Sequence, residues 1–199
     1  PAFWKRHSPV LFPIVGSVWE NEYRNEGIPY ILTQHGFARD MEFTLVSEKE
    51  NEVCYRLISN EETLQKYPFP FCLEISYHIH GKQIEVIWKV KNTGEKEMHF
   101  QIGAHPAFYW PDFDAATSER GFFGFDKKEG LKYILISEKG CADPSTEYTL
   151  ELADGLLPLD IHSFDKDALI LEGEQTHKVT LYNKEKRAYL SLHFDAPVV

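Results

Sequence analysis

Residues 71–80 read FCLEISYHIH, and residues 83–90 read QIEVIWKV after the turn Gly81-Lys82. Apolar side chains alternate with other side chains in both runs, with a period of two. This alternation is the signature of β-strands with one buried face. Two such runs joined by a short, glycine-containing turn predict a β-hairpin. This hairpin is the predicted centre of the fold.

Other alternating segments flank the hairpin. Asn92-Thr93-Gly94 is a second turn signal, and the alternation resumes over residues 98–102, which predicts a third strand of a meander. Residues 53–57 predict an earlier strand. Near the C-terminal end, apolar residues on both sides of the polar turn 183–186 predict a further hairpin: Val179, Leu181, Leu190, Leu192 and Phe194.

Helical signals are short. Residues 60–66 predict a short helix or turn before Pro68, and residues 163–168 predict the same with Ser163 as N-cap. No segment has a sustained period of 3.6 residues. The prediction is therefore an all-β protein, one antiparallel β-sandwich domain over residues 1–199. Periodicity alone also fits a barrel.

Composition narrows the class of protein. The chain has 199 residues, 43% hydrophobic and 26% charged, which is enough for one full core. A net charge of −10 disfavours binding to nucleic acid or to anionic membranes. No apolar run approaches ~20 residues, and no signal peptide is visible. Three cysteines without metal-type spacing indicate reduced thiols and a cytoplasmic location.

The two ends of the sequence predict a truncated chain. The chain begins at Pro1, its first methionine is Met41, and it stops on the apolar pair Val198-Val199. Natural C-termini more often end in polar, frayed residues. We therefore expect the sandwich to be incomplete.

The first candidate site is the segment 34–40, which reads QHGFARD. Gly36 permits a sharp turn or a close approach to a ligand. His35 offers a neutral donor and acceptor, and Arg39 offers a fork of donors that suits paired hydroxyls. The alternative is an ordinary loop in which Arg39 pairs with Asp40, and spacing alone favours that alternative.

The second candidate is the segment 103–111, which reads GAHPAFYWP. Pro106 restricts His105 to an extended conformation and so presets the direction of its imidazole. Three aromatic residues follow at 108–110. An imidazole can act as acid or base near neutral pH. The alternative is a structural histidine at the corner between a strand and a loop, and the two interpretations are evenly balanced.

Two further clusters are weaker. Asp165 and Asp167 lie two residues apart in the segment 163–170 and could bind sugar hydroxyls, although capping or solvation is the favoured interpretation. His78 and His80 leave one face of a strand, and His99 could join them to bind a metal. We favour an ordinary solvent face there, because no carboxylate or cysteine has an obvious ligand spacing. Phosphate loops and dinucleotide-binding turns are missing from the sequence.

Three motifs, in this order, carry a family resemblance: residues 35–39 (HGFAR), 103–108 (GAHPAF) and 167–170 (DALI). Together with the opening residues 3–6 and 9–16, the chain resembles the aldose 1-epimerase (galactose mutarotase) family, and its LacX-like branch in particular. The resemblance spans essentially the whole chain. It implies a galactose-mutarotase-like β-supersandwich and the interconversion of anomers of a free or phosphorylated sugar, without a cofactor.

The resemblance also implies roles for particular residues. His105 matches the general acid of the family, His35 and Arg39 match its substrate-binding residues, and Asp167 matches an aspartate that binds sugar hydroxyls. The general base of the family is a glutamate near the C-terminus, and it matches no residue of this chain. Glu172 and Glu174 follow Asp167 closely, but nothing assigns that role to them.

Two alternatives remain open at this point. The first is a non-catalytic carbohydrate-binding module on the same fold, which the missing glutamate favours. The second is a metal-dependent enzyme of cupin type that uses His78, His80 and His99. The sequence indicates neither which sugar is bound nor the oligomeric state.

Overall fold

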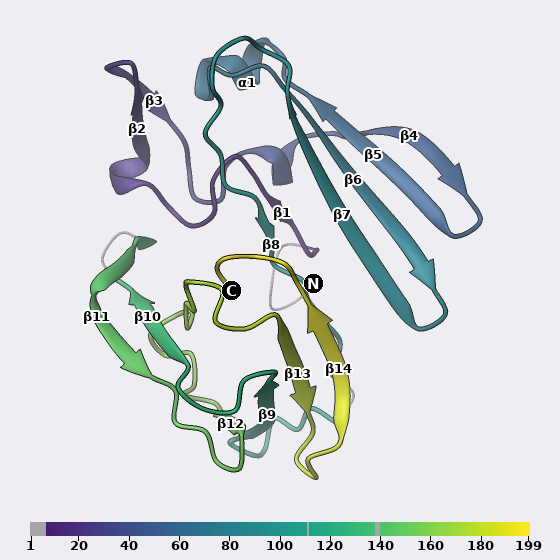
Figure 1. Cartoon of the computed structure of the whole chain (residues 1–199), viewed down its shortest axis with the longest axis vertical. Helices are drawn as coiled ribbons and strands as arrows, with labels where there is room; N and C mark the ends of the chain where they lie inside the picture. Colours follow the sequence, from purple (N-terminus) through teal and green to yellow (C-terminus); the bar gives the residue numbers. More distant parts are fainter. Residues whose placement is uncertain (1–6, 111, 138–139) are drawn as a thin grey trace. The chain divides into compact units, whose positions relative to one another are not determined.

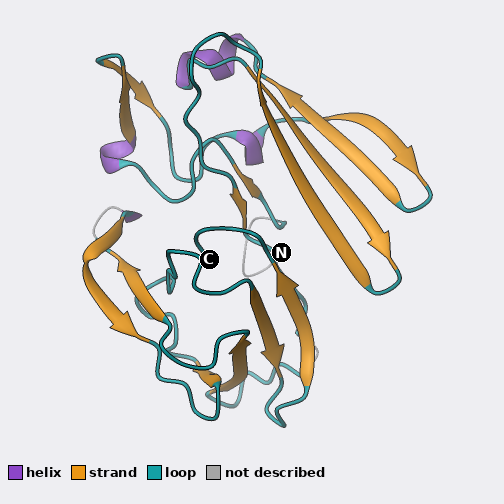
Figure 2. Ribbon diagram, in the orientation of Figure 1, coloured by secondary structure: helices purple, strands orange, loops and turns teal. Residues whose placement is uncertain are grey.

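The computed structural model describes residues 7–110, 112–137 and 140–199, and its regular structure is almost entirely antiparallel β (Figures 1 and 2). Contacts between residues group the chain into two compact units, Pro1–Ala107 and Phe108–Val199. The prediction of a single domain over 1–199 stays a prediction. None of the helices in the described ranges has the length and apolar character needed to span a membrane.

The first unit contains the predicted central hairpin. Its main sheet has the order β4-β5-β6-β7, with every neighbouring pair antiparallel. Ile79 pairs with Ile84 and His80 with Gln83, so Gly81-Lys82 is the turn, as predicted. The strand predicted at 53–57 is also confirmed. The bounds of these strands are β4 (Thr44–Lys49), β5 (Glu52–Ile58), β6 (Phe71–His80) and β7 (Gln83–Asn92).

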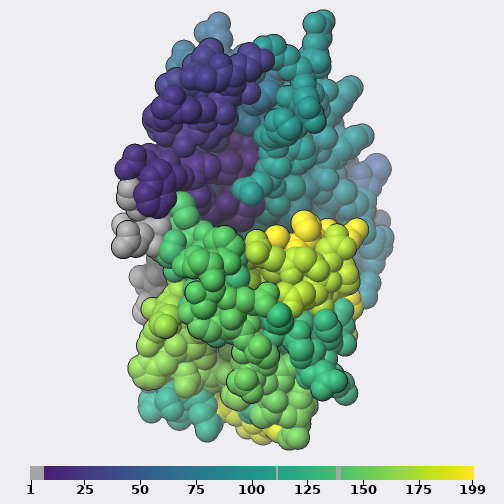
Figure 3. Space-filling view, turned by 60° about the vertical axis from the view of Figure 1, so that its left-hand side comes forward, coloured from purple at the N-terminus to yellow at the C-terminus, as the bar shows by residue number. Residues whose placement is uncertain are grey.

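Shorter elements surround this sheet. The predicted short helix is α1 (Glu61–Lys66), where the side chain of Asn60 accepts a hydrogen bond from the Thr63 amide and caps the helix. In Figure 3 the hairpin β2–β3, dark purple, lies at the surface of its unit. The remaining elements of this unit are β1 (Val10–Leu11), β2 (Glu22–Asn25), β3 (Ile28–Ile31), β8 (Gly103–Ala104) and the 3₁₀ turns Trp19–Asn21 and Ala38–Asp40.

Burial changes along β6. Phe71 and Leu73 at the start of the strand are fully buried, whereas Ile79, near its end, is 51% exposed. The start of β6 belongs to the hydrophobic core of the unit, where the ring of Phe71 meets that of Phe12 at 4.9 Å and that of Tyr67 at 6.3 Å. Figure 1 shows the other end of the β6–β7 hairpin extending away from α1. The apolar alternation of β6 therefore predicts the strand, but only its first half predicts the core.

The prediction of a third meander strand over residues 98–102 is wrong. These residues are irregular, and the next strand is the two-residue β8, which pairs with β1 and not with β7. The hydroxyl of Tyr67 donates to the carbonyl of His99 at 2.7 Å, and the amide of Gln101 donates to the carbonyl of Pro13 at 2.9 Å. Met98 and Ile102 pack against the core although their backbone pairs with no strand. The apolar residues therefore alternate in the sequence without forming a β-strand.

The second unit has a sheet of order β12-β9-β13-β14 and a separate pair β10–β11. The predicted C-terminal hairpin is confirmed, with Val179 opposite Leu192 and Leu181 opposite Leu190. The segment 163–168 forms turns, not a helix, and the Ser163 hydroxyl accepts from the Asp160 amide at 2.8 Å, so the N-cap assignment was wrong. The bounds are β9 (Glu119–Phe125), β10 (Lys132–Ile136), β11 (Ala142–Thr149), β12 (Leu156–Asp160), β13 (Lys178–Tyr182) and β14 (Ala188–His193).

Candidate functional site

The backbone around His35 is folded into a tight, left-handed turn. His35 has φ +65°, a region in which histidine is enriched among the few non-glycine residues that adopt it. Its amide donates to the carbonyl of Gly16 at 2.7 Å, and the Gly16 amide donates to its Nδ1 at 3.0 Å. Because Nδ1 accepts this bond, the neutral ring carries its proton on Nε2. The second nitrogen of His35 is therefore a hydrogen-bond donor.

Gly36 allows this turn to lie directly against the first strand segment. A Cβ atom on Gly36 would lie 2.3 Å from the carbonyl oxygen of Phe12, and its φ of +66° favours glycine. The same carbonyl oxygen accepts hydrogen bonds from the amides of Phe37 and Ala38 at 3.1 and 3.2 Å. The position of the His35 loop is thus fixed by the backbone of residue 12.

The His105 segment is attached to the same part of the chain. Val10 pairs with Ala104 and Leu11 with Gly103 in the β1–β8 ladder. Beyond β8, the amide of His105 donates to the carbonyl of Pro9 at 3.2 Å. Residues 9–12 therefore hold the His35 loop on one side and the His105 loop on the other.

This arrangement brings two histidines together that are 70 positions apart in the sequence. The ring centroids of His35 and His105 are 4.7 Å apart, with the ring planes at 82°. His35 is half-buried and His105 is exposed, so one imidazole is held by the fold while the other can reach solvent or a ligand. Residues 34–40 and 103–107, which are the parts of the two candidate segments within the first unit, therefore belong to one site.

Arg39 lies in the same turn as His35. Its Nη2 donates to the carbonyl of Gln34 at 2.7 Å, which holds the guanidinium against the backbone that precedes His35. Its Nε is 3.7 Å from Asp40 and is buried without a hydrogen-bond partner among the described residues. The alternative interpretation, in which Arg39 simply pairs with Asp40, is met only by this long contact of 3.7 Å. A buried donor without a partner suits a site for a polar ligand.

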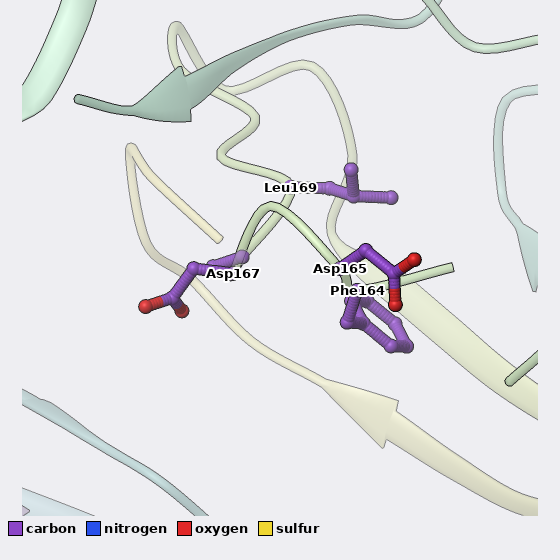
Figure 4. A pocket seen from close by; sticks show the side chains of 5 residues that line it. Phe164, Asp165, Asp167 and Leu169 are labelled. Atoms are coloured by element: carbon purple, nitrogen blue, oxygen red, sulfur yellow. The ribbon is translucent and has the colours of Figure 1, made fainter. Parts of the chain in front are cut away.

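Asp167 belongs to the second unit, where it lines an open hollow with Phe164, Asp165, Ala168 and Leu169 (Figure 4). Its φ is +69°, and its amide donates to the carbonyl of Phe164 at 3.0 Å. Figure 4 shows the carboxylates of Asp165 and Asp167 pointing to opposite sides. Asp165 accepts from Nδ1 of His162 at 2.8 Å. The two aspartates therefore do not act as a pair, and Asp167 keeps its carboxylate for other partners.

The remaining sequence features divide into three groups. The opening motif at residues 3–6, and Pro111 at the end of the second motif, lie outside the described residues. Tyr109 is 81% exposed, whereas Trp110 packs on Tyr189 at 6.2 Å within the second unit. His99 does not join His78 and His80. Its carbonyl accepts a hydrogen bond from Tyr67, which precedes β6, whereas His78 and His80 lie at the far end of β6.

Sequence reasoning missed the residues that assemble the site. The carbonyl oxygens of Pro9, Phe12 and Gly16 and the side chain of Gln101, which accepts from the Val15 amide at 3.0 Å, hold the two loops. Three of these partners act through backbone atoms, which leave no trace in residue type. The signal that was present is the glycine at position 16, whose φ is +76°.

Comparisons with known proteins agree with this geometry. Residues 2–121 match a protein-family model described as Aldose 1-epimerase, a range that contains His35, Arg39 and His105. The chain is 32% identical over 202 residues to the chromosomal and the plasmid-encoded protein LacX of Lactococcus lactis subsp. lactis. Each alignment covers 98% of this chain and 68% of the relative.

Solved structures similar to this chain are also galactose mutarotase-like proteins. The chain is similar to a galactose mutarotase related enzyme from Lactobacillus acidophilus, with 33% identity, a TM-score of 0.84 and coverage of 93% of this chain and 61% of that one. A galactose mutarotase-like protein from Lactobacillus casei has 27% identity, a TM-score of 0.74 and coverage of 92% and 63%. The chain thus spans just over three fifths of these two structures. The predicted all-β, galactose-mutarotase-like fold is confirmed.

Proposed function

Since this chain belongs to the aldose 1-epimerase family, we propose that it interconverts the two anomers of a free or phosphorylated aldose. The observation that carries the proposal is the contact between His35 and His105, whose ring centroids are 4.7 Å apart. Two imidazoles at one place can deliver a proton and a hydrogen bond to neighbouring oxygens of a pyranose. Packing alone does not explain the pair, because His105 is exposed.

In this proposal His105 is the general acid. Its imidazolium gives a proton to the ring oxygen as the bond from that oxygen to C1 breaks, while a base removes the proton of the C1 hydroxyl. The open-chain aldehyde then rotates about C1–C2, and the reverse transfers close the ring on the other face. Pro106 and the bond from the His105 amide to Pro9 support this role, because they limit the directions that the imidazole can take.

His35 and Arg39 bind the sugar in the same proposal. Because the Gly16 amide donates to Nδ1, Nε2 of His35 carries the proton, and in this proposal it donates to a sugar oxygen. The buried Nε of Arg39 is a second donor, without a partner among the described residues. The family resemblance alone assigns Asp167 of the second unit to sugar hydroxyls, and its exposed carboxylate can accept hydrogen bonds. Two donors side by side suit a ligand with many hydroxyls.

The reaction also needs a general base. In the family it is a glutamate near the C-terminus, and none of the 199 residues matches it. We propose that a carboxylate of this kind completes the reaction. We also propose a cytoplasmic location, which the three free cysteines Cys54, Cys72 and Cys141 support.

The test is anomer exchange of glucose, galactose and glucose 6-phosphate, followed by NMR on the full-length protein. His105→Ala should lower the exchange rate by about two to four orders of magnitude, since a general acid contributes that much. His193→Ala, which removes an exposed histidine at the end of β14, is the matched control. Normal exchange in His105→Ala would refute the assigned acid.

The same experiment separates the proposal from its alternative. Saturation-transfer NMR measures sugar binding independently of exchange. If the full-length protein binds a sugar but never accelerates exchange, it is a carbohydrate-binding module on this fold and not an epimerase. If His35→Ala weakens binding while His193→Ala does not, the histidine pair is the sugar site in either case.

A further inference from the structure

We propose that the end of the β6–β7 hairpin binds a divalent transition-metal ion of the zinc class through His78, His80 and Glu85. The proposal is independent of the sugar site. The nitrogen and oxygen ligand atoms of these three side chains all lie within 4.8 Å of one another. Imidazole and carboxylate are ligands that zinc and its neighbours prefer, and two histidines with one glutamate form a known type of open site.

The strand ladder explains why these three side chains meet. His78 and His80 are two residues apart on β6 and leave the same face of the sheet. Glu85 on β7 lies directly opposite His78 in the antiparallel register. Opposed residues of an antiparallel pair have Cα atoms about 4.5–5.5 Å apart. A hairpin with a two-residue turn fixes this register, so the positions of the ligands are set by the backbone.

The distances suit a metal after small side-chain rotations. In a tetrahedral site with bonds of about 2.0–2.1 Å, ligand atoms lie roughly 3.4 Å apart. Nδ1 of His78 is already 3.4 Å from a carboxylate oxygen of Glu85. His80 and Glu85 are both exposed, so their side chains are free to rotate and solvent can supply the remaining ligands. The partly open geometry indicates a site completed by water.

A fourth residue supports this arrangement. The other nitrogen of His78, Nε2, lies 3.8 Å from a carboxylate oxygen of Glu52, which is the partner of His78 on β5. When the metal binds at Nδ1, the proton on Nε2 points toward Glu52. A histidine ligand whose second nitrogen donates to a carboxylate is the usual outer arrangement of protein zinc sites. Glu52 is therefore a positioning residue, and it also pairs with Lys49 at 3.3 Å.

Sequence spacing did not reveal the carboxylates. Glu85 is seven residues from His78, and Glu52 is more than twenty residues away, so neither has a motif-like spacing. Both are opposite His78 once the register of the sheet is known. The histidine first considered as the third ligand, His99, lies elsewhere in the unit.

The experiment is calorimetric titration of the untagged protein with Zn²⁺, followed by the absorption spectrum of the Co²⁺ complex. We expect one equivalent of metal and an intense visible Co²⁺ band typical of low coordination number. His80→Gln should weaken binding at least about 100-fold, and Glu52→Gln about 10- to 100-fold, as outer partners of metal sites do. His99→Gln, which removes an exposed histidine of the same unit, should bind as the unaltered protein does.

Each outcome decides the proposal. Less than half an equivalent of bound Zn²⁺, or unchanged binding in His80→Gln, would overturn it. Equal losses in His80→Gln and His99→Gln would show scattered surface binding instead of a site. Circular dichroism without metal should be unchanged in all variants, because His80 and His99 are exposed, so loss of folding cannot imitate loss of ligands.

Discussion

Two histidine pairs in the described part of the chain are built in opposite ways. His78 and His80 are neighbours because a β-strand repeats every two residues, and the hairpin register adds Glu85. His35 and His105 are neighbours because two irregular loops bind opposite sides of residues 9–12. The first arrangement follows from local geometry, and the second requires the folded core. Proximity in one case is a property of a strand and in the other a property of the whole unit.

The largest expected effect on stability compares two places in the first unit. One is the hydrophobic core that supports the contact between His35 and His105, and the other is the end of the β6–β7 hairpin that carries His78 and His80. Phe71 and Ile79 lie on one face of the same strand, but Phe71 is fully buried and Ile79 is 51% exposed. Phe71→Ala should lower the free energy of unfolding by about 3–5 kcal/mol, since it removes a ring packed on Phe12 and leaves a cavity.

Ile79→Ala is the matched control on the same strand. It should lower the free energy of unfolding by less than about 1 kcal/mol, because the side chain is already half in solvent. Urea unfolding followed by tryptophan fluorescence measures both variants. Similar losses in the two would mean that the end of the hairpin is buried, contrary to the distinction drawn between the two pairs.

The second prediction acts on the backbone that positions His35. In Gly36→Ala, the new Cβ would lie 2.3 Å from the Phe12 carbonyl oxygen, and the residue would be held at φ +66°. We expect a loss of roughly 3 kcal/mol or more in the free energy of unfolding, from strain and displacement together. The nuclear Overhauser contact between the rings of His35 and His105 should weaken as the loop moves away from residue 12.

Gly81→Ala provides the comparison at the other pair. Gly81 has φ +61°, but a Cβ atom at this position would meet nothing within 4 Å, so this variant carries the conformational cost alone. We expect a loss of about 1 kcal/mol in the free energy of unfolding. If Gly36→Ala costs no more than Gly81→Ala, the close approach to Phe12 does not hold the His35 loop.

The difference between contacts set by strand geometry and contacts that need the folded core also explains how much of the fold the sequence could predict. Alternation identified β5, β6, β7 and the hairpin β13–β14, because strands with a buried face impose a period of two. It failed at residues 98–102, where Met98 and Ile102 face the core from an irregular chain tied by Tyr67 and Pro13. Periodicity records which side chains are buried, not which strand pairs with which.

The candidate site shows the same limit. Spacing alone favoured ordinary loops at 34–40 and left His105 evenly balanced, and only the family resemblance joined the two segments. The contact between His35 and His105 depends on backbone atoms of Pro9 and Phe12, which any residue type could supply. Conversely, the partners of His78 were predictable in principle, because the hairpin prediction already implied the register that places Glu85 opposite it.

The smallest expected effect on the free energy of unfolding comes from removing one tyrosine hydroxyl near each histidine pair. The buried Tyr67 donates to the carbonyl of His99 at 2.7 Å and so ties the chain that leads to His105. Tyr67→Phe should cost about 1 kcal/mol at neutral pH, because the carbonyl loses its partner. Tyr55→Phe, in the sheet that carries His78, should cost less than about 0.5 kcal/mol, since the Tyr55 side chain is 37% exposed and water can replace its contacts.

Tyr67 also gives this comparison a dependence on pH. Burial raises the pKa of its hydroxyl well above the usual value of about 10. The unfolded chain therefore releases this proton at a pH where the folded protein keeps it, so the stabilisation is complete below pH ~10 and is lost as the pH rises further. The free energy of unfolding should fall less steeply above pH ~10 in Tyr67→Phe than in the unaltered protein. Parallel slopes would mean that the hydroxyl is reached by water, and that the chain leading to His105 is not anchored in the core.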